Sequence, residues 1–327
     1  MPSQCRPAWL FGLILAHTCA PLLQAGFTVI QPTDPIWEVD QVRSTDDRFD
    51  GEVRHVARGG TPIVMDYDGD GWQDIYLMVW GYPDVLYRNT RHGSFVRVDN
   101  PFGFDADNGG NMPAWADFDN DGDKDMFVGV LKRGRHLFYI NQGDNVFVEE
   151  AEKRGVALPS NDPHSATGVA VGDINRDGYL DLFVGDWGGP SDPSVRRQHY
   201  ALFLNRGAAN PGYFTNITES AGIELPSGTI SVFAPNLSDL DGDCWPDLPI
   251  VSDYGKSALF FNNTNNTFTD ATAVSGIGID RNGMGNAIGD VNSDGLLDWW
   301  VTAIGYKAAS DDPEFVGNQL YLNQGDR

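Results

Sequence analysis

The stretch DYDGDGWQD at residues 66–74 alternates aspartate with other residues and closes on a further aspartate. The same nine-residue pattern returns as DFDNDGDKD from Asp117, DINRDGYLD from Asp173, DLDGDCWPD from Asp239 and DVNSDGLLD from Asp290. Alternating carboxylates on a tight loop supply clustered oxygens, and calcium takes six to eight of them at about 2.3–2.6 Å. Glycine at the sixth place allows the sharp turn that gathers the ligands. The pattern therefore predicts up to five structural Ca²⁺ ions.

Each predicted loop offers side-chain oxygens at places one, three, five and nine, with a backbone carbonyl at place seven. An ordinary acidic turn without a bound ion is the alternative interpretation. The expected ligands are Asp66, Asp68, Asp70 and Asp74; Asp117, Asp119, Asp121 and Asp125; Asp173, Asn175, Asp177 and Asp181; Asp239, Asp241, Asp243 and Asp247; and Asp290, Asn292, Asp294 and Asp298.

The segments around the acidic loops repeat as well, at intervals of roughly 50 to 65 residues, which is typical of propellers and arrays. Each loop follows a short apolar run and precedes three strand-like runs, the second ending in Asn and the third opening with Phe or Tyr. β-branched and aromatic residues between Gly, Asn and Asp favour strands. The sequence therefore predicts an all-β fold, a β-propeller of five four-stranded blades.

The fifth unit lacks its last strand, and residues 26–30 (GFTVI) resemble that strand in other units. We expect this N-terminal strand to complete the last blade and close the ring. A larger ring, with blades that are absent or too degenerate to recognise, is the alternative.

Residues 1–25 have the character of a signal peptide: Arg6, an apolar core over residues 8–16, and Leu-Gln-Ala before Gly26. We therefore expect a mature propeller over residues 26–327 that is secreted, or periplasmic or at the cell surface in a bacterium. An N-terminal membrane anchor or buried helix is the alternative. No stretch of the mature chain approaches transmembrane length.

The chain carries a net charge of −24, and many of its acidic residues stand in the five loops. This balance argues against nucleic-acid binding, which needs a basic surface. An EF-hand begins similarly but needs a glutamate at place twelve, where this chain has residues typical of strands. The fourth loop has Cys244 at place six, and a left-handed backbone there would make this site the weakest.

The loops, the preceding runs GVAVGD (168–173) and NAIGD (286–290), and the following runs LFLN…YFTNITESAGI and LFFN…TFTDATAVSGI resemble the FG-GAP or VCBS repeat family. That family includes integrin-α-like propellers and those of cartilage-acidic-protein-like proteins. The resemblance covers roughly residues 27–327. It implies a calcium-bearing propeller used mainly for adhesion or recognition, although its best-known members have seven blades.

If the acidic loops share one face of the ring, the loops between second and third strands lie on the other. Those loops hold aromatic and basic residues, the usual anchors of binding sites. Ordinary solvated loop residues are the alternative interpretation. The candidate ligand-binding residues are Arg133, Arg135, Trp187, Arg196, Arg197 and Tyr306.

The sequence thus predicts a secreted recognition or adhesion module for an extracellular protein or glycan, and no catalytic residues. The alternative is a polysaccharide lyase or glycosidase with a site at the ring axis, where His136, His164 and His199 could converge.

Overall fold

The computed structural model describes residues 61–78, 84–91, 94–103, 110–130, 135–158, 166–187, 200–225, 231–253, 255–280, 282–304 and 317–325. Within these ranges the chain forms antiparallel sheets in which each strand pairs with the next one along the chain. Four sheets have four strands, and the fifth has three described strands. The all-β prediction is confirmed, because the one α-helix in the described ranges, α1 (Ala151–Arg154), has a single turn.

We call the sheets blades 1 to 5 in chain order. Blade 1 comprises β1 (Thr61–Met65), β2 (Asp74–Met78), β3 (Val85–Asn89) and β4 (Phe95–Asp99). Blade 2 comprises β5 (Gly110–Ala116), β6 (Asp125–Val130), β7 (Leu137–Asn141) and β8 (Phe147–Glu149). Blade 3 comprises β9 (Ala166–Gly172), β10 (Asp181–Asp186), β11 (Tyr200–Asn205) and β12 (Phe214–Asn216). Blade 4 comprises β13 (Ser231–Pro235), β14 (Leu248–Asp253), β15 (Ala258–Asn262) and β16 (Phe268–Asp270), and blade 5 comprises β17 (Gly283–Gly289), β18 (Asp298–Ala303) and β19 (Gln319–Tyr321).

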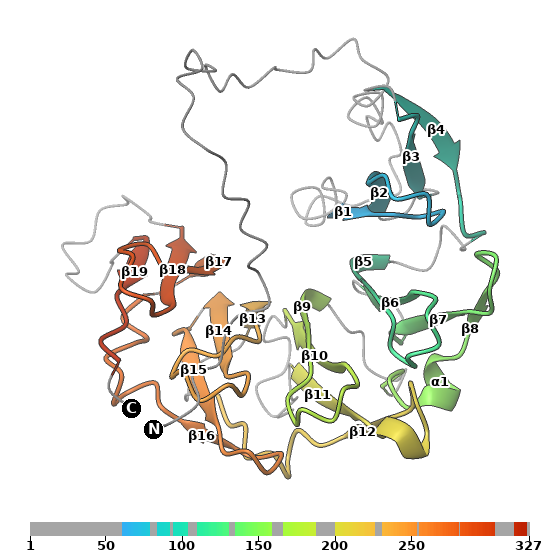
Figure 1. Cartoon of the computed structure of the whole chain (residues 1–327). Coiled ribbons are helices and arrows are strands. Elements are labelled where there is room, and N and C mark those ends of the chain that lie inside the picture. Colours follow the sequence, from blue (N-terminus) through green and yellow to red (C-terminus); the bar gives the residue numbers. More distant parts are fainter. Residues whose placement is uncertain are drawn as a thin grey trace, which may run out of the picture.

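The blades follow one another around a ring, with the first strand of each blade innermost (Figure 1). Consecutive inner strands lie side by side, from β1 through β5, β9 and β13 to β17. This is the arrangement of a five-bladed β-propeller, as predicted. Residues 26–30, which we expect to complete blade 5, lie outside the described ranges, so that closure of the ring by this strand stays a prediction.

The hydrophobic core consists of layers between neighbouring blades. Phe127 and Phe138 of blade 2 share one buried cluster with Phe203 and Phe214 of blade 3, and further clusters join blades 1 and 2, 3 and 4, and 4 and 5. Alternate residues of a strand point to opposite faces, so a strand between two neighbours is apolar on both. Accordingly every residue of β6, β10 and β14 is buried.

Small residues let the inner strands approach one another closely. A Cβ atom at Gly168 of β9 would lie 2.5 Å from the backbone oxygen of Phe233 in blade 4 and 2.3 Å from Cδ of Pro235. Side chains also bridge the inner strands: Asn111 donates to the Ala166 carbonyl at 2.9 Å, and Thr167 donates to the Val232 carbonyl at 2.6 Å. These contacts set the spacing of the blades and hence of the loops at their ends.

Candidate functional site

Each acidic loop joins the first and second strands of its blade, as the sequence predicted, and all five have the same backbone. Place six is left-handed in every copy, and the amide N–H of place six donates to the carboxylate of place one at 2.8–3.1 Å. The N–H of place seven donates to Oδ1 of place five at 2.9 Å in every copy. These bonds fix the aspartates toward the inside of the loop before any ion binds. The place-six residues are Gly71, Gly122, Gly178, Cys244 and Gly295.

The ninth-place aspartate is the first residue of the second strand in blades 1, 2, 3 and 5 and directly precedes that strand in blade 4, and it is almost completely buried in all five blades. Its Oδ2 accepts the N–H of place two at 2.8–3.1 Å, and its Oδ1 accepts the N–H of an asparagine at 2.6–3.0 Å. This asparagine is the last residue of the third strand in blades 1 to 4 and lies two residues beyond it in blade 5. One carboxylate therefore ties together the loop, the second strand and the third strand. The five residues are Asp74, Asp125, Asp181, Asp247 and Asp298.

The asparagine that bonds to this aspartate connects several segments of the chain, a role that its recurrence in the sequence did not reveal. In every blade its Nδ2 donates to the carbonyl of place eight, and its Oδ1 accepts the N–H two residues further on. In blades 3, 4 and 5, Nδ2 also donates to the place-two carbonyl of the preceding blade, at 2.8, 2.9 and 2.6 Å. The recurring Asn at the end of the third run was the available signal. The residues are Asn89, Asn141, Asn205, Asn262 and Asn323.

Carboxylates converge in three of the loops closely enough to hold a cation. The groups, whose oxygens lie within 4.8 Å of one another, are Asp66, Asp68 and Asp70; Asp117, Asp119 and Asp125; and Asp239, Asp241 and Asp247. Buried oxygens without a hydrogen-bond partner among the described residues occur in two of these groups: Oδ1 of Asp68, Asp117 and Asp119. A buried carboxylate oxygen without a partner is costly, and a calcium ion would satisfy it. The residues of the second loop, which offers two such oxygens, therefore fit the ion.

The third and fifth loops have asparagine at place three, and their polar groups bond to one another. Asn175 donates to Asp177 Oδ2 at 3.2 Å, and Asn292 donates to Asp294 Oδ2 at 2.8 Å. An asparagine oxygen is also a calcium ligand. The structure thus brings the predicted ligands of these loops together without forming a cluster of three carboxylates.

Burial without a counter-charge changes the acidity of the ninth place. Desolvation raises the pKa of Asp125, Asp181 and Asp247 to about 7 in each case, against backbone hydrogen bonds that lower it, two for Asp125 and Asp181 and three for Asp247. The pKa of Asp119 is also raised, first by burial and then by the neighbouring carboxylate of Asp121. A dication in the loop would favour the ionised forms.

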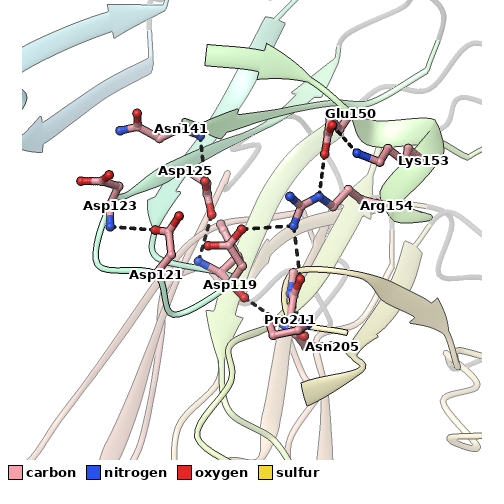
Figure 2. Close-up of polar contacts among 12 residues, drawn as sticks. Asp119, Asp121, Asp123, Asp125, Asn141, Glu150, Lys153, Arg154, Asn205 and Pro211 are labelled. Atoms are coloured by element: carbon pink, nitrogen blue, oxygen red, sulfur yellow. Dashed lines mark hydrogen bonds and ion pairs between the residues drawn. The ribbon is translucent and has the colours of Figure 1, made fainter. Parts of the chain in front are cut away.

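A buried arginine borders the second loop (Figure 2). Arg154 of α1 pairs with Glu150 at 2.9 Å and with Asp119 Oδ2 at 3.3 Å. It also donates to the Pro211 carbonyl at 3.3 Å and lies 4.8 Å from the ring centre of Tyr213 in blade 3. Arg154 therefore connects a predicted ion ligand to the neighbouring blade.

Arginines also contact the first loop. Arg88 pairs with Asp68 at 2.6 Å and Arg91 pairs with Asp70 at 2.7 Å. The hydrogen bond from Arg91 lowers the pKa of Asp70. Both arginine side chains are about half exposed, at 52% and 53%.

Contacts between loops place them side by side. Asn120 of the second loop donates to the Gly178 carbonyl of the third at 2.9 Å, and Arg176 of the third loop lies 5.5 Å from the ring centre of Trp245 in the fourth. The second to fourth loops thus share one face of the ring. Since every blade is an antiparallel meander, loops between second and third strands emerge on the opposite face.

Cys244 adopts φ +74°, so the left-handed backbone that the sequence analysis anticipated at this place is present. Its amide still donates to Asp239 Oδ2 at 2.9 Å. The weaker calcium affinity of this loop stays a prediction.

Two candidate residues of the opposite face are described, and both contact other parts of the chain. Arg135 pairs with Glu149 at 2.6 Å and with Glu152 at 3.2 Å. The indole N–H of Trp187 donates to Asp253 of blade 4 at 3.0 Å. The remaining four candidates, Arg133, Arg196, Arg197 and Tyr306, lie outside the described residues.

Of the three histidines that could converge at the ring axis in the alternative, catalytic interpretation, only His136 is described. His136 is completely buried against Phe127, with ring centres 5.6 Å apart, and Nδ1 accepts the Val130 N–H at 3.4 Å. His164 and His199 lie outside the described residues.

Comparison with known proteins identifies the repeats. The model of the FG-GAP-like repeat matches residues 66–128, 129–184 and 239–301, more than half of the chain. Human cartilage acidic protein 1 is 25% identical over 296 residues, covering 83% of this chain and 41% of that protein. The Xenopus tropicalis protein of the same name is 26% identical over 318 residues, covering 88% of this chain and 43% of that protein. The chain thus spans less than half the length of these curated relatives.

Among solved structures, an Agrocybe aegerita lectin that recognises non-reducing terminal N-acetylglucosamine aligns with a TM-score of 0.46 and 16% identity. That alignment covers 82% of this chain and 64% of the lectin chain. The family assignment therefore rests on the repeat matches and on the five loops that share one geometry. The chain belongs to the FG-GAP-like repeat family.

Proposed function

We propose that this chain is a secreted β-propeller that binds calcium in its acidic loops and acts as a recognition or adhesion module for an extracellular protein or glycan. The observation that carries the calcium assignment is the pair of buried carboxylate oxygens in the second loop, Oδ1 of Asp117 and Oδ1 of Asp119, that have no hydrogen-bond partner among the described residues. The acidic ligand clusters and the left-handed turn at place six agree with it.

Calcium has a structural role in this proposal. The ninth-place aspartate and its asparagine partner connect each loop to two strands, and in three blades also to the preceding blade. An ion that neutralises the loop carboxylates relieves their repulsion and stabilises this whole unit. Even weak extracellular sites, with dissociation constants of roughly 10⁻⁴–10⁻³ M, fill where calcium is abundant.

The recognition role depends on the opposite face, because the acidic loops are engaged in holding blades together. Proteins often carry function on long loops held by a rigid scaffold, and here the loops between second and third strands contain aromatic and basic residues. Trp187 stands where blades 3 and 4 meet, a position from which one ligand can contact two blades. Its indole is held by Asp253, so its orientation is fixed before binding.

The extracellular location and the choice of partner have indirect support. The matched relatives are named for cartilage, whose matrix is extracellular. Among the described residues, no helix has the length and apolar character needed to cross a membrane. The net charge of −24 disfavours nucleic acid as the partner.

Calcium binding is tested by thermal unfolding with excess calcium and with chelator. We expect chelation to lower the melting temperature markedly, and Asp173→Asn to reduce the calcium-dependent part of the shift. The matched control is Glu219→Gln, which removes an exposed acid outside the loops. A melting temperature that is the same with calcium and chelator contradicts the calcium assignment.

Recognition is tested on an array of glycans and extracellular proteins, probed with and without chelator. Once a partner is found, joint charge reversal of Arg133, Arg196 and Arg197 should abolish binding. Reversal of Arg206, which follows the third strand of blade 3 on the calcium face, serves as the control and should leave binding intact. Unchanged affinity after the triple reversal refutes the assignment of the binding face.

A further inference from the structure

The first acidic loop differs from the others because two guanidinium groups lie on its carboxylates. Arg91 donates from Nε and Nη2 to a single oxygen, Asp70 Oδ2, at 2.9 and 2.7 Å. Arg88 contacts Asp68 Oδ2 in the same manner, with Nε at 2.7 Å and Nη2 at 2.6 Å. The described residues of the third and fifth loops have no Lys or Arg within ion-pair distance of their carboxylates. Places three and five of the first loop are thus already neutralised.

The oxygen that Arg91 occupies is the one that the loop geometry leaves for a cation. At place five, Oδ1 accepts the N–H of place seven in all five loops, so Oδ2 is the oxygen without a backbone hydrogen bond and the freer of the two to ligate an ion. In the third and fifth loops this oxygen takes only an asparagine amide, a neutral group. In the first loop the corresponding oxygen, Asp70 Oδ2, accepts two hydrogen bonds from the Arg91 guanidinium, which is permanently charged.

Arg91 reaches this oxygen because of its position two residues after Asn89. That position is left-handed in every blade: φ is +66° at Arg91, and Gly143, Gly207, Thr264 and Gly325 stand at the equivalent places. Glycine in three blades fits the backbone requirement, whereas arginine there is strained. A Cβ atom built on Gly207 would lie 2.7 Å from Asp177 Oδ2. A side chain from this position therefore points straight at the place-five carboxylate.

We propose that Arg91, assisted by Arg88, occupies the first loop in place of calcium, so that this loop binds no ion under conditions that fill the others. A dication in the loop would have to displace the Arg91 fork from its ligand oxygen. It would also lie beside two fixed positive charges that repel it. The inference rests on the proposed calcium binding of the remaining loops. It implies that the acidic loop of blade 1 is stabilised by arginines, independently of calcium.

The experiment counts bound ions. Calcium titration by calorimetry, and terbium titration by luminescence, are run on the wild-type protein and on the double variant Arg88→Gln, Arg91→Gly. Glycine is the residue that three other blades use at the second position, so the backbone is preserved. We expect the double variant to bind one more ion per chain than the wild type.

Trp72 at place seven allows emission gained in the first loop to be assigned, because its indole sensitises terbium bound there, whereas Trp245 sensitises the fourth loop in both proteins. In the double variant, Trp72→Phe should remove the gained luminescence, and in the wild type it should leave the emission unchanged. A second, independent variant is Asp70→Asn in the wild-type background, which should leave the ion count unchanged. Asp177→Asn in the third loop is its control and should lower the count by one.

Each outcome is decisive. A double variant with the same ion count as the wild type, or an Asp70→Asn protein that loses one ion, overturns the inference while leaving calcium binding by the other loops intact. A wild type that binds no ion, combined with a double variant that binds one, supports the inference and overturns the proposed calcium role. If neither protein binds an ion, both are overturned.

Discussion

Replacing Asn205 by alanine tests how much the side-chain hydrogen bonds of this recurring asparagine contribute to stability. Its side chain is buried, at 2% exposure, and makes four hydrogen bonds: from Nδ2 to the carbonyls of Phe118 and Leu180, and to Oδ1 from the amides of Gly207 and Gly212. A hydrogen bond contributes about 1 kcal/mol net, and a buried group left without a partner costs about 1–3 kcal/mol. The change should therefore lower the free energy of unfolding by about 4 kcal/mol.

The matched control is Asn89→Ala in blade 1. Its two side-chain bonds, to Gln73 and from Arg91, are exposed, so water replaces them and we expect a loss of about 1 kcal/mol. Both variants are compared by urea unfolding and by thermal melting in excess calcium, where roughly 10 °C and 2–4 °C are the expected decreases. If Asn205→Ala and Asn89→Ala are equally destabilising, the bond between blades contributes nothing and the reasoning is refuted.

Three further predictions concern the loops and the blade spacing. In chelator, the free energy of unfolding should fall as the pH rises from about 4 to about 7, because three buried ninth-place aspartates have pKa values of about 7 and the folded state binds their protons more tightly than the unfolded state. The calcium-induced rise in melting temperature should accordingly be larger at pH 8 than at pH 5. A rise that does not depend on pH counts against this prediction. Cys244→Gly should bind calcium more tightly in the fourth loop than Cys244→Ala, since both remove the thiol and only glycine relieves the left-handed backbone, by about 1 kcal/mol; equal affinities by calorimetry contradict the idea. Gly168→Ala should lower the free energy of unfolding in urea by about 1–3 kcal/mol, because its Cβ atom would clash with blade 4. Gly289→Ala is the control, since a Cβ atom there meets no atom within 4 Å, and it should cause no such loss. Similar losses in the two variants would show that the close approach of blades 3 and 4 at Gly168 is not what destabilises the protein.

Local sequence patterns predicted what depends on local geometry. The acidic loops, their turn at place six and the four-strand unit follow from the spacing of Asp, Gly and alternating apolar residues, and even the left-handed conformation of Cys244 follows from its alignment with glycines. These features repeat five times, so that each copy supports the others.

The features that the sequence did not predict depend on contacts between segments far apart in the chain. Nothing near Arg91 in the sequence shows that its side chain reaches Asp70, because this requires the third strand to pair with the second and the turn after it to be left-handed. His136 appears as a loop residue in the sequence, yet it is buried against Phe127. The ion pairs of Arg135 likewise depend on the path of the chain through β8 and α1.

The bond from the asparagine to the preceding blade, present in blades 3, 4 and 5, has an implication for how such proteins gain repeats. Every repeat carries both the donor amide and the acceptor carbonyl, so any repeat can follow any other, as in Asn205 to Phe118, Asn262 to Ile174 and Asn323 to Leu240. Tandem duplication of one repeat therefore creates a new junction with the same bonds as the old ones. Rings with different numbers of blades can arise in this way, because each added unit brings its own connector.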